Sequence, residues 1–140
     1  MDIRLARPDE FGQVAELVTA GRLPVAGLAG AWRTWVAVDG DQLLGTASLE
    51  RHGDALLLRS VAVRADQRGR GVGAELVRAA LAAAGPRRPV ALLTETAAGW
   101  FPRFGFRPVE RTALDPALAA SAELAGACPA TARAFLRPGG

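Results

Sequence analysis

The chain has 140 residues, half of them hydrophobic, and a formal net charge of +3. This length and composition predict a single folded domain, residues 1–140, and exclude a disordered chain. All 17 basic residues are arginine, which excludes a phosphate loop or a Schiff-base site that depends on lysine. One histidine and one cysteine are too few for a zinc or iron–sulfur centre, so we expect no metal site.

Other features of the sequence limit the compartment and the partners. No apolar run approaches the length that spans a bilayer, and the first residues, MDIRLARPDEF, do not form a secretory signal. Cys128 is the single cysteine, which fits a reducing compartment. We therefore expect a cytoplasmic protein without a membrane partner. The arginines are interspersed with acids along the chain, so a nucleic-acid partner is not expected either.

Hydrophobic periodicity predicts an α/β (α+β) domain with a central mixed β-sheet flanked by helices. In chain order we expect a strand at 3–6, a helix at 8–21, a loop with a short helix at 23–31, three strands within 34–64 joined by turns at 39–41 and 52–54, a helix at 69–86, a strand at 89–96, a short helix at 97–106, a strand at 106–111, a helix at 115–127 and a closing strand at 131–138. The third of the three consecutive strands is apolar on both faces apart from Arg59 and Ser60, as in the centre of a sheet.

The stretch RADQRGRGVGA, residues 64–74, joins this central strand to the next helix. Its three glycines leave the backbone open to close approach by a ligand, and the first N–H groups of a helix have no partner within it. Arg64, Arg68 and Arg70 add positive charge. The combination predicts a site for a phosphate or pyrophosphate group. The spacing G-x-G-x-G differs from the dinucleotide fingerprint, so we do not expect a dinucleotide there.

Three segments in this order resemble the GNAT acetyltransferase superfamily. QRGRGVG matches R-x-x-G-x-G from Arg68 to Gly73 and resembles the acetyl-CoA loop, while LLRSVAV and GWFPRFGFRPVE resemble the central strand and the segment that ends in Gly-Phe. The resemblance covers essentially the whole chain. More narrowly, ASLERHGDALLLRSVAV, LLTETAAGWFPRFGFRPVER and SAELAGACPATA are similar to small acetyltransferases associated with arsenic resistance, which are in turn similar to the acetyltransferase domain of N-acetylglutamate synthases.

The resemblance implies a GNAT-like fold, acetyl-CoA as co-substrate, and direct attack of an amine on the thioester. It implies that backbone N–H groups of one loop hold the pyrophosphate, namely those of Arg68, Gly69, Arg70, Gly71, Val72, Gly73 and Ala74. Main-chain groups of Val61, Ala62 and Val63 would pair with the pantetheine arm, and the Val61 N–H would stabilise the developing oxyanion. Many GNAT enzymes have a tyrosine where this chain has Phe101, so the usual proton donor to the thiolate is missing. Cys128 is either a substitute donor or a buried core residue.

Two carboxylates, Glu50 and Glu95, are candidates for the general base that deprotonates the acceptor ammonium. Each is alternatively a solvated charge at a strand end, and His52 is expected to be a surface histidine in a hairpin turn. Arg59 is expected either to bind a substrate carboxylate or to form an ion pair with one of the two glutamates. Arg22, in the loop after the first helix, is a second candidate for binding the substrate.

The resulting hypothesis is an acetyl-CoA-dependent N-acetyltransferase that acts on a small-molecule amine or amino-acid acceptor, as a monomer or homodimer. Acidic amino acids and analogues of the arsinothricin or phosphinothricin type fall within this acceptor class. Acetylation of protein or peptide amines is an alternative within the same chemistry. A non-catalytic acyl-CoA-binding regulatory module is an alternative of a different class.

Overall fold

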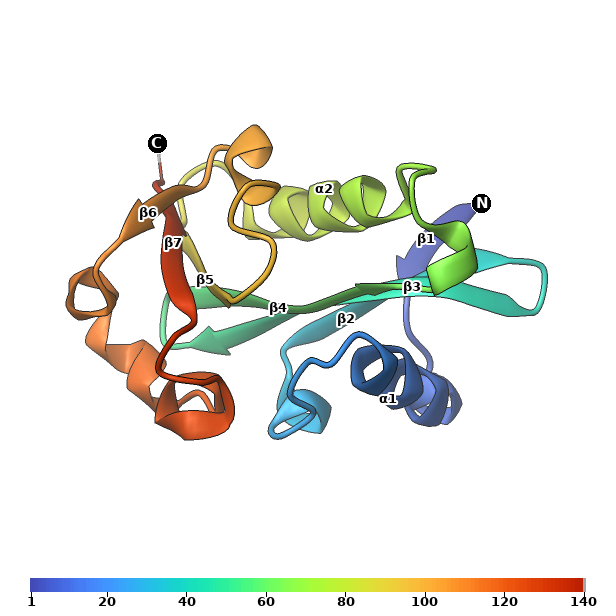
Figure 1. Cartoon of the computed structure of the whole chain (residues 1–140), viewed down its shortest axis with the longest axis horizontal. Helices are drawn as coiled ribbons and strands as arrows, with labels where there is room; N and C mark the ends of the chain where they lie inside the picture. The colour runs from blue at the N-terminus through green and yellow to red at the C-terminus, as the bar shows by residue number, and fades with distance from the viewer. Residues whose placement is uncertain (140) are drawn as a thin grey trace.

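The computed structural model describes residues 1–139, in which seven strands form a mixed sheet of order β1-β2-β3-β4-β5-β7-β6 (Figure 1). The strands are β1 (Asp2–Leu5), β2 (Arg33–Asp39), β3 (Gln42–His52), β4 (Ala55–Val63), β5 (Val90–Thr94), β6 (Arg107–Val109) and β7 (Arg133–Arg137). Neighbouring strands are antiparallel except β4 and β5, which are parallel. The predicted fold class, a mixed sheet flanked by helices, is confirmed.

Helices cover both faces of the sheet, with α1 (Phe11–Ala20) on one side and α2 (Val72–Ala84) on the other (Figure 1). The largest core cluster lies between α2 and the sheet, and a second cluster lies under α1. The remaining helical elements are short: η1 (Pro8–Glu10), η2 (Leu28–Gly30), η3 (Ala65–Gln67), η4 (Phe101–Phe104), η5 (Arg111–Ala113), η6 (Pro116–Ala120) and η7 (Glu123–Ala127). Within residues 1–139, none of the helices combines the length and apolar character that crossing a membrane requires.

The predicted continuous helix at 115–127 is wrong. Asp115 caps a helical turn as expected, because its side chain accepts a hydrogen bond from the Ala117 N–H, but this turn is the short η6. The chain is then extended at Ser121, whose hydroxyl accepts a hydrogen bond from the Glu123 N–H and begins η7. The break allows Leu118, Ser121 and Glu123 all to be buried, which one straight helix of this length would not allow.

A β-bulge in β4 changes which side chains face α2. Thr46 of β3 pairs with Ala62, but Ser48 pairs with Arg59, so β4 has one extra residue in this interval. Ser60 in the bulge has a φ of 60°, a strained conformation for a residue that is not glycine. Leu58 and Val61 consequently both pack in the core on the α2 side, although an unbroken alternation would place them on opposite faces.

The sheet opens between β4 and β5. These strands pair at only two positions, Leu56 with Val90 and Leu57 with Ala91. Beyond Leu57 the β5-facing edge of β4 has no strand pairing, whereas β5 continues to pair with β7 as far as Thr94. The bulge and the opening thus lie at the same end of β4, and a cleft is found at that end.

Candidate active site

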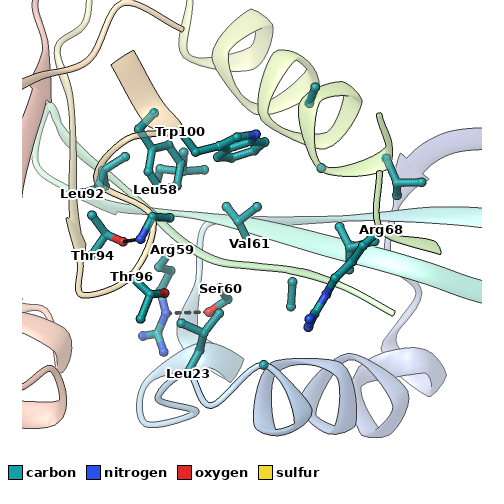
Figure 2. Close-up of a pocket in the computed structure, with 18 of the residues that line it drawn as sticks. Leu23, Leu58, Arg59, Ser60, Val61, Arg68, Leu92, Thr94, Thr96 and Trp100 are labelled. Atoms are coloured by element: carbon teal, nitrogen blue, oxygen red, sulfur yellow. Dashed lines mark hydrogen bonds between the residues drawn. The ribbon is translucent and has the colours of Figure 1, made fainter. Parts of the chain in front are cut away.

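A cleft of about 620 Å³ lies in the opening of the sheet, with the second half of β4 as its floor (Figure 2). Its walls come from six further parts of the chain: the loop after α1, the glycine turn before α2, the start of α2, the end of β5, the η4 region and the segment around η7. Figure 2 shows Val61 and Trp100 on the side toward α2, and Arg59 and Ser60 on the side toward the loop that carries Leu23. The cleft therefore has two chemically different sides, separated by the β4 backbone.

On the α2 side, the helix begins with free N–H groups. Gly71 is the N-cap with a φ of 81°, and no side chain caps the helix. The first bond within the turn runs from the Glu75 N–H to the Gly71 carbonyl oxygen, so the three preceding N–H groups have no partner inside the helix. Built at Gly69 or Gly71, a Cβ atom would meet nothing within 4 Å, so the space in front of this backbone is open. The turn therefore has the open backbone and unpaired N–H groups that an anion site requires.

The structure brings nine of the ten residues predicted to bind the co-substrate to the cleft. They are Val61, Ala62, Val63, Arg68, Gly69, Gly71, Val72, Gly73 and Ala74. Arg70 does not line the cleft. Helix α2 also begins at Val72, three residues later than expected, because Gly69 and Gly71 both adopt positive φ in the turn.

On the opposite side of β4, Arg59 lies at the centre of a buried group of charges. Its side chain is 0% exposed, and its Nη1 donates to Glu50 Oε2 at 2.8 Å. Its Nε donates to Ser60 Oγ at 3.0 Å and lies 3.3 Å from Glu123 Oε2. Two further bonds, to the carbonyl oxygens of Pro24 and Ala26, fix the loop that follows α1. Of the two roles expected for Arg59, the ion pair with Glu50 is present, and its guanidinium nitrogens already have partners.

Glu50 is buried within this group but does not line the cleft. Burial by itself would raise its pKa, but hydrogen bonds from His52, Arg59 and Ser121 outweigh burial and hold the pKa below the ordinary value. His52, expected at the surface in the hairpin turn, is the partly exposed last residue of β3 beside that turn, and its Nε2 lies 2.7 Å from Glu50 Oε1. Glu50 is a weak proton acceptor, because its pKa is lowered and its carboxylate oxygens already accept hydrogen bonds from His52 and Arg59.

Two other predicted residues also lie outside the cleft. Glu95 is exposed and accepts a hydrogen bond from Thr131 Oγ1 at 2.9 Å, whereas its neighbours Thr94 and Thr96 line the cleft. Arg22 has a φ of 59° in the turn after α1 and does not line the cleft, although the residues on either side of it do. The structure therefore does not bring together the two predicted bases or the second predicted substrate arginine.

A carboxylate that the motif-based predictions missed does line the cleft. Glu123 is only 3% exposed, and burial is the main cause that raises its pKa above the ordinary value. The nearby Glu50 adds to this rise, while Arg59 and a hydrogen bond from the Cys128 thiol oppose it. The sequence did carry a signal, because Glu123 is the one charged residue in the apolar segment 116–128. A single charge in such a segment indicates a buried group with a specific environment.

Cys128 and Phe101 are both buried and both line the cleft. Burial is the largest cause that raises the pKa of Cys128 to about 12, and the adjacent Glu123 carboxylate adds to it. The thiol is therefore protonated at neutral pH and is a poor nucleophile. Phe101 packs edge-to-face against Trp100 and Phe106 and offers no proton. With no tyrosine in the chain, a phenol is absent from this site.

Comparison with known proteins agrees with this geometry. The family model described as an acetyltransferase (GNAT) domain matches residues 30–108. No curated protein sequence matches the chain. Among solved structures, Rv2747 from Mycobacterium tuberculosis, in complex with CoA, has a TM-score of 0.77 and 22% identity, over 97% of this chain and 98% of that one.

Two further structures show the same fold. N-acetylglutamate synthase from Neisseria gonorrhoeae, complexed with coenzyme A and N-acetyl-glutamate, has a TM-score of 0.77 and 17% identity, over 97% of this chain but 34% of that one. Escherichia coli ElaA has a TM-score of 0.72 and 17% identity, over 97% and 98% of the two chains. Together with the family model, the open sheet and the uncapped glycine turn establish that this chain belongs to the GNAT acetyltransferase family, as an acyltransferase with acetyl-CoA as its co-substrate.

Proposed function

We propose that this protein transfers the acetyl group of acetyl-CoA to the amino group of a small amino-acid-like acceptor, by direct attack while both substrates are bound. The observation that carries the proposal is the division of one cleft into two sides. One side presents free backbone N–H groups, and the other presents buried charged side chains. A two-sided cleft holds two substrates next to each other, which is what direct transfer needs.

The α2 side of the cleft, with its free backbone N–H groups, would bind the co-substrate. N–H groups of the turn from Arg68 to Ala74 would bind the pyrophosphate, with Arg68 adding charge to the same part of the cleft. The unpaired edge of β4, at Val61, Ala62 and Val63, would pair with the amide groups of the pantetheine arm. The Val61 N–H follows the bulge and would face the thioester oxygen, where it stabilises the negative charge that develops during attack.

The other side accounts for the acceptor. It is formed by the loop at Leu23 and Pro24, by Ser60 and by Glu123, and a carboxylate there suits an amine. Its size favours a small molecule, because the same cleft must also hold the acyl end of acetyl-CoA. Similarity in fold to the N-acetylglutamate synthase domain supports an amino acid as the acceptor. Acidic amino acids and analogues of the arsinothricin or phosphinothricin type are the first compounds to test.

The departing thiolate needs a proton, and the chain offers no phenol for this purpose. Water in the open cleft or the ammonium formed on the product nitrogen would supply it. The Phe101 ring would contribute only by packing against the hydrophobic end of the cleft. This arrangement makes deprotonation of the acceptor the step for which the protein must provide a group.

The decisive test is release of free thiol from acetyl-CoA by the purified protein in the presence of single amines. We expect turnover with free amino acids, including the acidic ones, and with phosphinothricin. Mass spectrometry should detect the N-acetyl product. Turnover with peptides alone would favour the peptide-acetylating alternative. Tight binding of acetyl-CoA without turnover on any amine would favour the regulatory module.

A further inference from the structure

We infer that Glu123 receives the ammonium group of the acceptor and removes its proton before attack on the thioester. This inference rests on the proposed function and names the base at its acceptor site. The residue comes from the irregular segment between β6 and β7, so neither glycine spacing nor strand patterning indicated it. Glu123 differs from the other candidate acids in its position and in the charge balance around it.

Position separates Glu123 from the other acids. It lines the cleft, whereas Glu50 and Glu95 do not. Its Oε2 atom lies 3.3 Å from Arg59 Nε, and that same nitrogen donates to Ser60 Oγ. Ser60 belongs to the strained bulge that directs Val61 toward the α2 side. The carboxylate therefore lies beside the point at which the β4 backbone separates the two sides of the cleft.

The charge balance of the buried group is incomplete. Within it, two carboxylates, those of Glu50 and Glu123, share one guanidinium, that of Arg59. Arg59 makes its shorter ion pair, 2.8 Å, with Glu50, and His52 supplies Glu50 with a second partner. Glu123 therefore carries negative charge that its surroundings compensate only in part. A buried charge of this kind is stabilised by a bound cation or by a proton.

The ammonium group of the acceptor supplies both a cation and a proton to Glu123. Bound beside Glu123, it completes the charge balance as a cation, and transfer of one proton then leaves a neutral carboxyl and a neutral amine. The amine lone pair forms the new C–N bond at the acetyl carbon as the C–S bond breaks. The nitrogen loses its second proton to the thiolate, and Glu123 returns its proton to water through the cleft. The balance is one ammonium and one thioester giving one amide, one thiol and one proton.

The groups that face Glu123 make it a better base than its neighbours. Its pKa is raised above that of an exposed glutamate, which makes the carboxylate a stronger proton acceptor. Arg59, Glu50 and the Cys128 thiol act on it directly, and Arg111 lies near enough to Cys128 to influence that thiol. The pKa of Glu50 shifts in the opposite direction, and Glu50 has an ion pair with Arg59 and a hydrogen bond from His52, so it holds Arg59 in place and is a positioning residue.

The test compares Glu123→Gln with the wild-type enzyme on the best amine found by thiol release. We expect Glu123→Gln to lower kcat by about 100-fold or more at pH 7, since a general base contributes typically 10²–10⁴-fold. The loss should shrink toward pH 9, where free amine becomes available. Affinity for acetyl-CoA, measured by calorimetry, should stay within about twofold. Glu110→Gln, an exposed glutamate outside the cleft, is the matched control and should behave like the wild type.

Other outcomes separate this inference from the proposed function. Wild-type turnover together with normal kcat in Glu123→Gln overturns the role of Glu123 and leaves the function intact. Loss of kcat in Glu95→Gln instead assigns the role to Glu95. Absence of turnover on every amine overturns both. If Glu123→Gln fails to fold, Glu123→Asp keeps the charge and shortens the reach, and an unchanged kcat and unchanged pH profile in that variant contradict the inference.

Discussion

The two sides of the cleft are built on different physical principles. On the α2 side, the groups that face the ligand are backbone N–H groups, and the residues that matter most are glycines with positive φ. On the other side, they are side chains, and what matters is the balance between two carboxylates and one guanidinium. A backbone site tolerates many side chains but depends on conformation. A site of buried charges depends on every charge that it contains.

The largest effect should follow removal of the shared cation. Arg59→Met leaves Glu50 and Glu123 buried without their guanidinium, and we expect a loss of about 3–5 kcal/mol in the free energy of unfolding. Urea unfolding at pH 7 measures it. Arg51→Met, which removes an exposed arginine that lies 3.6 Å from Asp54, should change stability by no more than about 0.5 kcal/mol. Equal stability of the two variants would contradict the charge balance assigned to this side.

Binding of acetyl-CoA tests the α2 side as a whole. A ligand that binds only the folded state should raise the free energy of unfolding by about 2.7 kcal/mol at a concentration one hundred times its dissociation constant. A thermal-shift titration with acetyl-CoA, with NAD as the control nucleotide, gives the measurement. A response to NAD without one to acetyl-CoA would mean that the glycine turn serves a different ligand.

Two glycines with positive φ, one at each end of α2, isolate the contribution of the turn. Gly71 has a φ of 81° and Gly85 a φ of 79°, and a Cβ atom at either would meet nothing within 4 Å. Gly71 is left-handed, with a ψ of 8°, so valine there should cost about 1–2 kcal/mol of stability. Gly85 has a ψ of 171°, a conformation that only glycine adopts readily, so valine there should cost about 1–3 kcal/mol. Only Gly71→Val should weaken acetyl-CoA binding, by about tenfold or more, because its side chain would stand where the backbone meets the pyrophosphate. Equal affinities in the two variants would remove the turn from the binding site.

The ion pair between Arg4 and Glu10 lies outside the cleft and joins one cation to one carboxylate. Its loss should have the smallest effect on stability, with a pH dependence opposite to that expected for Glu123. Arg4 bonds both carboxylate oxygens of Glu10 at 2.8 Å, and this lowers the Glu10 pKa from 4.5 to about 2. Its stabilisation is present above pH 4.5 and is lost as pH falls toward 2. Glu10→Gln should therefore lose about 1–2 kcal/mol at pH 7, where both carboxylate bonds are intact, and little near pH 2.

Glu123 should show the reverse of this behaviour. Its folded pKa is raised, so its favourable contribution exists at low pH and is lost as pH rises through that pKa. Relative to the wild type, Glu123→Gln should become more stable as pH increases, and Glu10→Gln less stable. Urea titrations of both variants between pH 3 and pH 8 provide the measurement. The same sign of pH dependence in the two variants would show that Glu123 is fully compensated in the free protein.

The α2 side of the cleft follows from signals that are local in the sequence. Alternating apolar residues predicted the strands β2, β3 and β4, and the i, i+3, i+4 spacing predicted α2. The glycines predicted the turn between β4 and α2. Each of these signals is local in the sequence. Nine of the ten residues that the GNAT resemblance implied for the co-substrate line the cleft. The turn and the residues that follow it are contiguous in the chain, so no long-range contact was needed to predict them.

The opposite side of the cleft depends on contacts between distant parts of the chain. Glu50, Arg59 and Glu123 come from three separate segments, and their grouping depends on the break at Ser121, which lets Glu123 reach the sheet. The bulge at Ser60 is also a property of strand register, which the alternation pattern of β4 does not reveal. Burial, charge balance and pKa are set by the neighbours that folding brings together. For this reason the sequence identified the carboxylates that stand in the expected strands and missed the one that lines the cleft.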